Sequence, residues 1–306
     1  MGKTQNRQAR ETGVDRPING LVRMLIRAMP YMSRRFMHFL ANMFACIALV
    51  ICGNYRRRTA HNLRFLFPRD SAPVILFKVY RIFRNFAHYF VDLFVFSFKP
   101  GARLQDYVDT ISNWQQIDQA LGQGRGLLLA TAHLGNWEMG GFLLQEQGYP
   151  LNILYLKDRF SAIEQHRSVM RATARVREIP VGRQARAVIP VLKALRANEI
   201  VGLQIDRVLG GKGIEAPFLS GSYTFPAGPA LLAITSGAPL VPAFIYFGPK
   251  FRYQVILGEP VVVPKSGDRE RDIHLVVQRL AAVLEGQVRA HPYQWYCFDQ
   301  AIAGGR

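Results

Sequence analysis

Hydrophobic and polar positions follow two different patterns along this chain. Between residues 18 and 98, long apolar stretches carry polar side chains at helical spacing, which predicts helices throughout this region. From residue 113 onward, short aliphatic runs alternate with longer amphipathic stretches, as in chains that alternate strand and helix. The predicted strands are 126–130, 151–156, 200–205, 240–247 and 253–257. The predicted helices are 113–121, 136–147, 160–176, 184–197, 230–236 and 273–288.

This alternation also predicts the fold class and the organisation of the chain. It indicates an α/β fold with a mixed, largely parallel sheet and flanking helices. No internal repeat or low-complexity linker divides residues 99–306, which we expect to form one domain. Residues 18–98 are predicted to be a membrane-associated helical region, and the polar, basic residues 1–17 a disordered tail.

The apolar stretch Phe36–Gly53 is the main indication of membrane contact. Its 18 residues are close to the minimum for a bilayer span. Arginines flank it at both ends, which disfavours translocation, and His38 and Asn42 share one helical face. A spanning helix and a helix lying in the membrane interface both remain open. No signal peptide is evident, because the first 16 residues are polar.

A second stretch, 74–98, mixes aromatic side chains with Arg81, Arg84 and His88. This mixture suits an interface with anionic lipid, although a buried amphipathic helix with a solvated basic face explains it nearly as well.

Charge is concentrated near the beginning of the chain. The net charge is +18, and residues 1–70 hold 13 Lys or Arg against three acids. Nucleic acid is disfavoured as a partner, because the basic residues surround an apolar run and no nucleic-acid-binding motif is present. The three cysteines fit neither a disulfide framework nor a zinc site, so a reducing compartment is expected.

Residues 131–138, Thr-Ala-His-Leu-Gly-Asn-Trp-Glu, offer the clearest candidate chemistry. They place His133 and Glu138 between a predicted strand and a predicted helix, at the carboxyl edge of the sheet. A histidine there can take a proton from a hydroxyl, and a carboxylate can orient the ring and stabilise the imidazolium. The plainer interpretation is structural, with Asn136 as a helix cap and Glu138 as a partner of the helix dipole.

Two further residues, Asp206 and Arg207, follow the predicted strand 200–205 and should reach the same edge if the strands are parallel, where they are candidates for contacting substrate. The Arg207 guanidinium suits an anionic acceptor or a phosphate. A structural Asp–Arg pair at the strand end is the alternative.

Three candidates for binding an anionic group lie elsewhere. Arg159 follows the predicted strand 151–156, and Lys212 lies in a glycine-rich loop that could close over a substrate or be an ordinary turn. Gly228 opens a predicted helix whose exposed amides offer an anion site, although most helix starts bind nothing.

Several other kinds of site are disfavoured. The glycines of 122–126 precede a strand, which is the wrong side for a dinucleotide. The chain has no Walker A sequence and no Gly-x-Ser-x-Gly elbow, and its seven histidines are too dispersed to suggest a metal site. Direct transfer with no cofactor, no metal and no covalent enzyme intermediate is therefore expected.

The segment HLGNWE, preceded by an aliphatic strand, resembles the His-x4-Glu motif of the lipid A biosynthesis acyltransferase family, the lauroyl and myristoyl transferases. That family is related in motif to the glycerolipid acyltransferases. The basic block 56–58, the blocks 204–207 and 226–228, and the segment SGAPLVP at 236–242 extend the resemblance over residues 20–300. The chain departs from the family at 218–221 and 294–298, in regions that shape the choice of acceptor.

The resemblance implies a glycerolipid-acyltransferase-like core and a bacterial acyltransferase on the cytoplasmic face of the inner membrane. It implies transfer of a fatty acyl group from an acyl carrier protein or coenzyme A thioester to a hydroxyl of a lipid or glycolipid, most simply of lipid A type. Another acceptor, such as a lysophospholipid or a mannosylated lipid, and a catalytically silent lipid-binding protein are the alternatives. His133 would be the general base with Glu138 beside it, and Gly135, Asn136 and Trp137 would contact substrate.

Overall fold

The computed structural model describes residues 20, 24, 27–98, 103–156, 161–181, 187–208, 213–249, 252–299 and 301–304. Residues 1–17, the predicted disordered tail, lie outside the described residues, as do Arg159 and Lys212.

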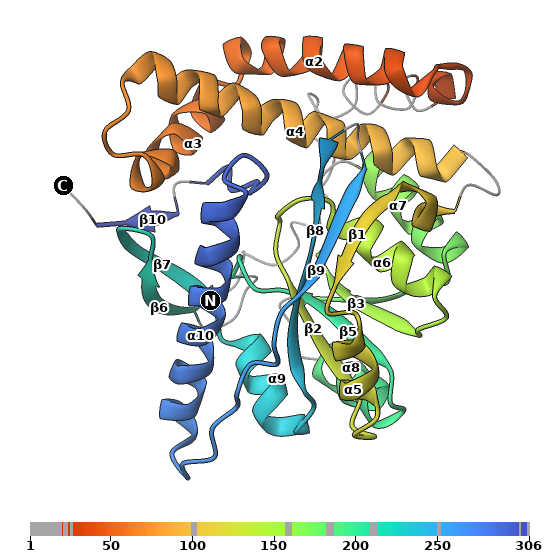
Figure 1. Ribbon diagram of the computed structural model, residues 1–306, viewed down its shortest axis with the longest axis vertical. Coiled ribbons are helices and arrows are strands. Elements are labelled where there is room, and N and C mark those ends of the chain that lie inside the picture. Colours follow the sequence, from red (N-terminus) through yellow and green to blue (C-terminus); the bar gives the residue numbers. More distant parts are fainter. Residues whose placement is uncertain are drawn as a thin grey trace, which may run out of the picture.

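The described residues form a seven-stranded sheet with the order β1-β9-β8-β2-β5-β3-β4. Neighbouring strands run parallel except β8 and β9, which are antiparallel. The predicted mixed, largely parallel sheet with flanking helices is thereby confirmed (Figure 1). The strands are β1 (Val108–Ser112), β2 (Leu127–Thr131), β3 (Leu151–Tyr155), β4 (Arg177–Pro180), β5 (Ile200–Gln204), β8 (Leu240–Phe247) and β9 (Tyr253–Leu257).

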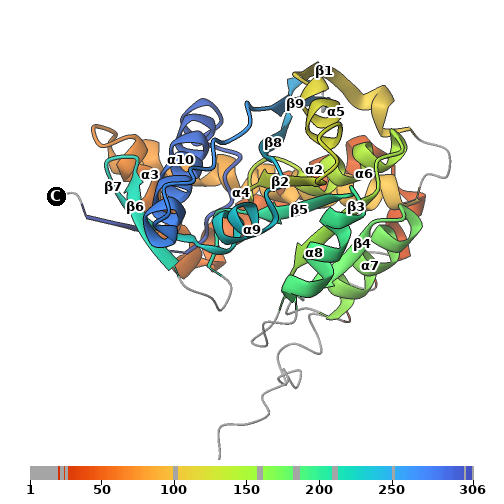
Figure 2. The same ribbon diagram turned by 90° about the horizontal axis from the view of Figure 1, so that it is seen from below.

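A second, three-stranded antiparallel sheet has the order β10-β7-β6. It packs beside the long helix α10, at the end of the molecule opposite α7 and α8 (Figure 2). The sequence patterns did not predict this sheet. Its strands are β6 (Gly213–Phe218), β7 (Gly221–Pro226) and β10 (Ile302–Ala303).

Alternation along the central strands divides the core into two apolar clusters, one on each face of the main sheet. In β2, Leu127 and Leu129 belong to one cluster and Leu128 and Ala130 to the other. Successive side chains of a strand point to opposite faces, so a strand covered on both sides is apolar throughout. The helices of this region are α5 (Gln115–Leu121), α6 (Trp137–Glu146), α7 (Ser161–Thr173), α8 (Val188–Arg196), α9 (Gly228–Ser236) and α10 (Arg269–Ala290).

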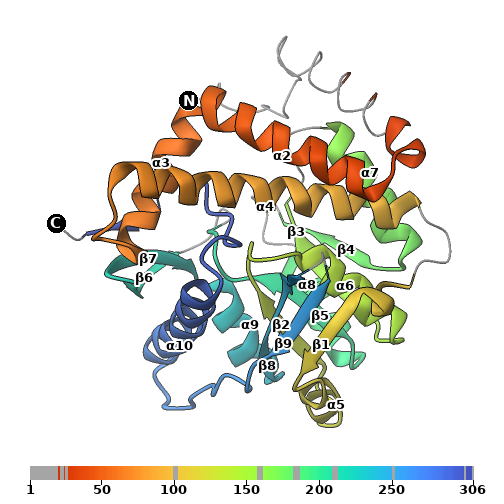
Figure 3. The same cartoon turned by 45° about the horizontal axis from the view of Figure 1, so that its top comes forward.

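Three N-terminal helices lie across one end of the sheet (Figures 1 and 3). They are α2 (Arg34–Ile51), α3 (Gly53–Leu66) and α4 (Ala72–Phe98). Helix α2 runs along α4 for most of its length, and α4 contributes to the same apolar cluster as α5 and α6. This layer therefore covers the sheet end on which the candidate site lies.

Helix α2 has two different apolar faces. One face packs against α4 through buried residues that include Met37, Ala41 and Ala45. The opposite face is exposed and large in area, with Phe36, Phe39, Met43, Phe44, Ile47, Val50 and Ile51 between 48% and 73% accessible. By length and composition, α2 is the one helix among the described residues that could cross a membrane.

Candidate active site

Two neighbouring parallel strands bring the site together. Strands β2 and β5 pair with Thr131 opposite Gln204, and the chain continues two residues beyond each partner to His133 and Asp206. The amide of Ile205 donates to the carbonyl of Thr131 at 2.8 Å, which extends the pairing past the strand ends. The side chains of His133 and Asp206, which were predicted to lie at the same edge of the sheet, are therefore in direct contact.

Asp206 holds His133 through both carboxylate oxygens. Nδ1 of His133 lies 2.9 Å from Oδ1, and the backbone amide of His133 donates to Oδ2 at 3.0 Å. Nε1 of Trp295 donates to Oδ2 at 3.4 Å, and the Tyr223 hydroxyl donates to the Asp206 carbonyl. An ionised carboxylate accepts hydrogen bonds, so Nδ1 carries the proton and Nε2 is left as the acceptor.

The Asp206 carboxylate is almost fully enclosed, at 1% exposed, and does not line the cavity described below. Burial by itself raises its pKa, but the neighbouring His133, together with its hydrogen bonds, outweighs burial and holds the pKa below the usual value. Asp206, which we expected to bind substrate, is therefore placed behind the imidazole and acts on it directly.

Glu138 lies in a different electrostatic setting. Its carboxylate, in the first turn of α6, accepts from Nε of Arg171 at 3.2 Å and also from Nη2, and it lies 3.9 Å from Nε of Arg167. Burial raises the pKa of the Glu138 carboxyl. The charges of Arg171, Arg167 and the nearby His133, with Arg171 contributing most, lower it by more, so that the pKa lies below its usual value. We predicted that Glu138 orients the His133 ring, but the carboxylate that accepts from Nδ1 of His133 is that of Asp206.

The loop between β2 and α6 is fixed by its own backbone. The amides of Gly135 and Asn136 donate to the carbonyls of Gln294 and Ile245, and the Tyr296 amide donates to the His133 carbonyl. Gly135 has φ +69°, and a Cβ there would lie 1.8 Å from the Ile245 oxygen, so no other residue fits. This glycine shapes the loop and is absent from the cavity wall.

Asn136 and Trp137 support the loop in different ways. Asn136 occupies the position before α6, yet its side chain makes no cap; it is fully buried and donates to the Tyr253 hydroxyl at 3.1 Å. The Trp137 ring stacks on Tyr89 at 4.5 Å and meets the edge of the His133 ring at 5.0 Å. Of the two, Trp137 lines the cavity.

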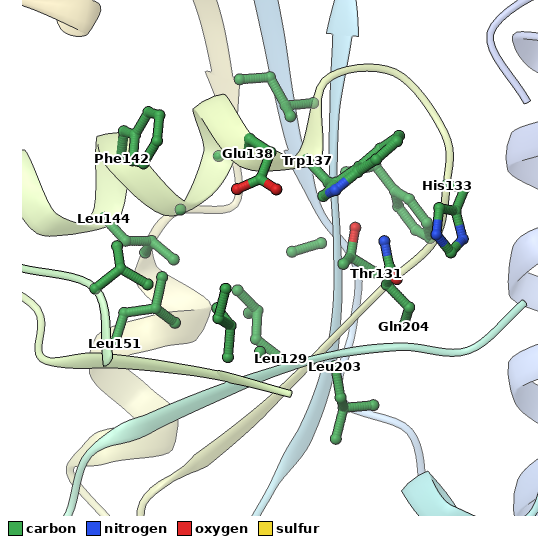
Figure 4. A pocket seen from close by; sticks show the side chains of 18 of the residues that line it. Leu129, Thr131, His133, Trp137, Glu138, Phe142, Leu144, Leu151, Leu203 and Gln204 are labelled. Carbon is green, nitrogen blue, oxygen red and sulfur yellow. The ribbon is translucent and has the colours of Figure 1, made fainter. Parts of the chain in front are cut away.

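A cavity of about 390 Å³ opens beside His133 and runs between α6 and the sheet (Figure 4). His133, Thr131, Gln204 and Trp137 lie at one side, and Leu144 and Leu151 at the other. Its apolar lining comes from α4, α5, α6 and five strands and includes Phe86, Phe90, Ile117, Leu129, Leu143, Ile153, Ala243, Val255 and Leu257. The charged groups in its wall are Glu138, Arg167, Arg171 and Arg207, and the His133 imidazole lies beside them.

The remaining candidates are only partly brought together. Arg207 lines the cavity and donates from Nη2 to the Tyr296 carbonyl at 2.9 Å. Gly228 begins α9 but lies outside the cavity wall. The described part of the chain has no cluster of three His, Cys, Asp or Glu side chains that could ligate a metal ion.

Arg167 and Arg171 are cavity residues that the sequence analysis missed. They stand four residues apart on α7 and therefore share one helical face. Arg171 also donates to Glu178 at 3.0 Å, and Arg167 donates to the Tyr89 hydroxyl at 2.8 Å. The predicted helix 160–176 is rich in arginine. The four-residue spacing of Arg167 and Arg171 is the signal that could have predicted a charged face on this helix.

Three mycobacterial proteins named phosphatidylinositol mannoside acyltransferase are similar to this chain. Those from two strains of Mycobacterium tuberculosis are 28% identical over 215 residues and 30% identical over 188 residues. The matches cover 69% and 61% of this chain but 66% and 57% of the relatives, less than two thirds of their length. One from Mycolicibacterium smegmatis is 27% identical over 214 residues, 69% of this chain and 68% of the relative.

A family model described as bacterial lipid A biosynthesis acyltransferase matches residues 14–301. The match contains the loop with His133, the strand end with Asp206 and the helices across the sheet. The family resemblance of the sequence motifs is confirmed over nearly the whole chain, and this protein belongs to the bacterial lipid A biosynthesis acyltransferase family.

Proposed function

We propose that this protein transfers a fatty acyl group from a thioester of acyl carrier protein or coenzyme A to a hydroxyl of a membrane glycolipid. The observation that carries the proposal is the His133–Asp206 pair at one side of a largely apolar cavity of about 390 Å³. A base beside an apolar chamber suits a reaction between a hydroxyl and a long-chain acyl group.

The chemistry follows from the ring geometry. Because Asp206 accepts the hydrogen bond at Nδ1, Nε2 of His133 can take the proton of the acceptor hydroxyl as its oxygen attacks the thioester carbonyl. The tetrahedral intermediate then expels the thiolate, which takes the proton back from Nε2. Asp206 stabilises the imidazolium between these two steps, as a buried carboxylate does in catalytic triads.

Glu138 and the arginines supply charge at the same place. The Glu138 carboxylate favours the imidazolium through space, and Arg171 holds that carboxylate in position. The Arg207 guanidinium in the cavity wall is suited to stabilise the oxyanion or to bind a phosphate of the substrate.

A mannosylated inositol lipid is the acceptor to test first, because the relatives carry the name phosphatidylinositol mannoside acyltransferase. A lipid A precursor is the second, because of the family to which the chain belongs. Both present hydroxyl groups on a sugar at the membrane surface, so the same base and the same cavity serve either.

We place the protein on the cytoplasmic face of the bacterial inner membrane, with α2 lying in the membrane interface. Met37, Ala41 and Ala45 pack against α4, so only the opposite face of α2 is available to lipid. A helix covered along one side by its own protein fits an interfacial position better than a span. Exposed Arg35, together with the basic α3, suits anionic lipid.

The decisive experiment is acyl transfer by full-length protein in lipid nanodiscs, followed by lipid mass spectrometry. The assay offers palmitoyl-coenzyme A and palmitoyl-carrier protein with each of the two acceptors. His133→Ala should lower turnover about 100-fold or more, since it removes the base. His274→Ala, at an exposed position on α10, is the matched control and should leave turnover unchanged. Near wild-type transfer by His133→Ala would contradict the mechanism.

A further inference from the structure

Three glycines from two elements line the cavity: Gly140 and Gly141 in α6, and Gly202 in β5. Glycine is unfavourable inside a helix or a strand, because it loses the most conformational freedom on folding and packs no side chain. None of the three has a positive φ, so no backbone conformation requires glycine at these positions.

Close backbone contact does not require these glycines either. A Cβ at Gly202 would lie 3.6 Å from side-chain atoms of Leu151 and Ile153, which is ordinary van der Waals contact. At Gly140 and Gly141 a Cβ would lie 3.3 Å from Cγ2 of Ile245 and 3.2 Å from Cδ2 of Leu151, which is tighter than ordinary contact, so these two cavity-lining side chains would have to shift. The missing methyl group at Gly202 leaves volume open in the cavity, and at Gly140 and Gly141 its absence lets Ile245 and Leu151 pack against α6 without being displaced.

The glycines lie in the part of the cavity that is farther from His133. Gly202 precedes Gln204 by two residues on the same face of β5, so it lies about 6–7 Å farther from the strand end near His133. Gly141 lies midway along α6 between Glu138 and Leu144, three residues from each. Figure 4 shows Leu144 on the far side of Glu138 from His133, so Gly141 is displaced from His133 in the same direction. The glycines thus widen the deeper part of the cavity and not its reactive end.

We propose that Gly140, Gly141 and Gly202 determine the length of the fatty acyl chain that the cavity accepts, and that they allow a long chain. This inference rests on the proposed function, because it takes the acyl group of the donor as the occupant. A methyl group added at Gly202 occupies space that the far carbons of a long chain need. One added at Gly140 or Gly141 displaces Ile245 or Leu151, which line the same part of the cavity, whereas a short chain does not reach this part.

The test measures binding of saturated acyl-coenzyme A and acyl-carrier-protein thioesters, from octanoyl to stearoyl, to full-length protein in nanodiscs. Gly202→Ala should weaken binding of the longest chains about tenfold or more, the usual scale for one methylene in an apolar pocket, and leave the shortest unchanged. Gly141→Ala should shift the preference the same way while favouring the helix. Gly286→Ala, on α10 with no atom within 4 Å of the added Cβ, is the matched control.

The outcomes separate the two proposals. An equal loss at every chain length, or no change in either variant, would overturn the role of the glycines and leave acyl transfer standing. Failure of the wild-type protein to bind any thioester would overturn both. A preferred chain length that becomes shorter in Gly202→Ala and Gly141→Ala, but not in Gly286→Ala, supports the inference.

Discussion

The two carboxylates near His133 have separate surroundings and separate tasks. Asp206 makes the hydrogen bonds to the ring and to the His133 amide, whereas Glu138 is occupied by Arg171. The pKa of each lies below the usual value for its type, Asp206 because of His133 and Glu138 because of its arginines, both against burial. Both groups are therefore ionised at neutral pH, and only Asp206 fixes the tautomer.

Asp206→Asn tests this division of roles. The amide can donate to Nδ1, which favours the wrong tautomer, so we expect kcat to fall about 100-fold to 10,000-fold with little change in KM. Steady-state kinetics in nanodiscs check this outcome. Asp272→Asn, another buried aspartate, which accepts from Ser266 far from the site, is the control. If kcat stays within a few-fold of wild type, Asp206 has no catalytic role.

Glu138→Gln should act mainly on stability. The change leaves the buried Arg171 with Glu178 as its remaining ion-pair partner among the described residues, and loss of one member of a buried ion pair costs about 3–5 kcal/mol. Denaturant unfolding in detergent measures the loss. Adding Arg171→Met should recover part of it, because the uncompensated charge is removed. Equal stability of Glu138→Gln and wild type would show that the ion pair contributes nothing.

His88 predicts how stability depends on pH. Burial, together with His38 and Arg84, lowers its pKa to about 3 against the attraction of Asp92. At about pH 5, His88 therefore stays neutral in the folded protein but gains a proton in the unfolded chain. The contribution of His88 to the free energy of unfolding is fully present above about pH 6.5 and is lost as the pH falls below that value. Thermal unfolding between about pH 7.5 and pH 5 should show this loss, and His88→Asn should flatten it. An unchanged slope in the variant would assign the effect to other groups.

The sequence pointed to His133 as a candidate but not to the carboxylate that contacts its ring. His133 stands in a motif of consecutive residues, and parallel strands placed Asp206 at the same edge. The contact itself joins residues 73 positions apart and depends on which strands are neighbours. Local sequence patterns do not reveal the order of the strands in the sheet. The prediction therefore took Glu138, the carboxylate nearer in the sequence, as the group that orients the ring.

Among the helices, α2 has an exposed apolar face, and we expect this face to bind the membrane. Phe39→Ser and Phe44→Ser remove side chains that are about half exposed, so each should weaken binding to anionic liposomes about tenfold. Liposome flotation measures the change. Val262→Ser, at an exposed apolar residue beyond β9, should have no effect. If all three variants bind equally well, α2 does not contact the membrane.

The elements that sequence patterns predicted are those with a strong apolar period. The strands in the middle of the sheet and the long helices were found within a few residues. Strand β1 was missed because four of its five residues are exposed, and β6 and β7 because glycine and proline lie at their ends. The division of 18–98 into three helices depends on turns between them that hydrophobicity alone does not indicate.

For the whole molecule, the net charge of +18 makes the choice of donor testable. An acidic carrier protein is attracted over an extended surface, and salt screens such attraction beyond about 10 Å at 0.1 M. Transfer from acyl carrier protein should therefore fall more steeply with ionic strength than transfer from coenzyme A. Initial rates with both donors at increasing potassium chloride measure this difference. Equal slopes would mean that the basic surface does not recruit the carrier protein.

Helix α4 separates the cavity beside His133 from helix α2 and contacts both. Phe86 and Phe90 of α4 line the reactive cavity, while α2, with its exposed apolar face, lies along the same helix. Under the proposed function, an acceptor anchored in the bilayer would reach His133 by moving laterally, without leaving the lipid. The quantity that governs the rate is the mole fraction of acceptor in the membrane, so diluting it with inert lipid at constant total acceptor should slow the reaction.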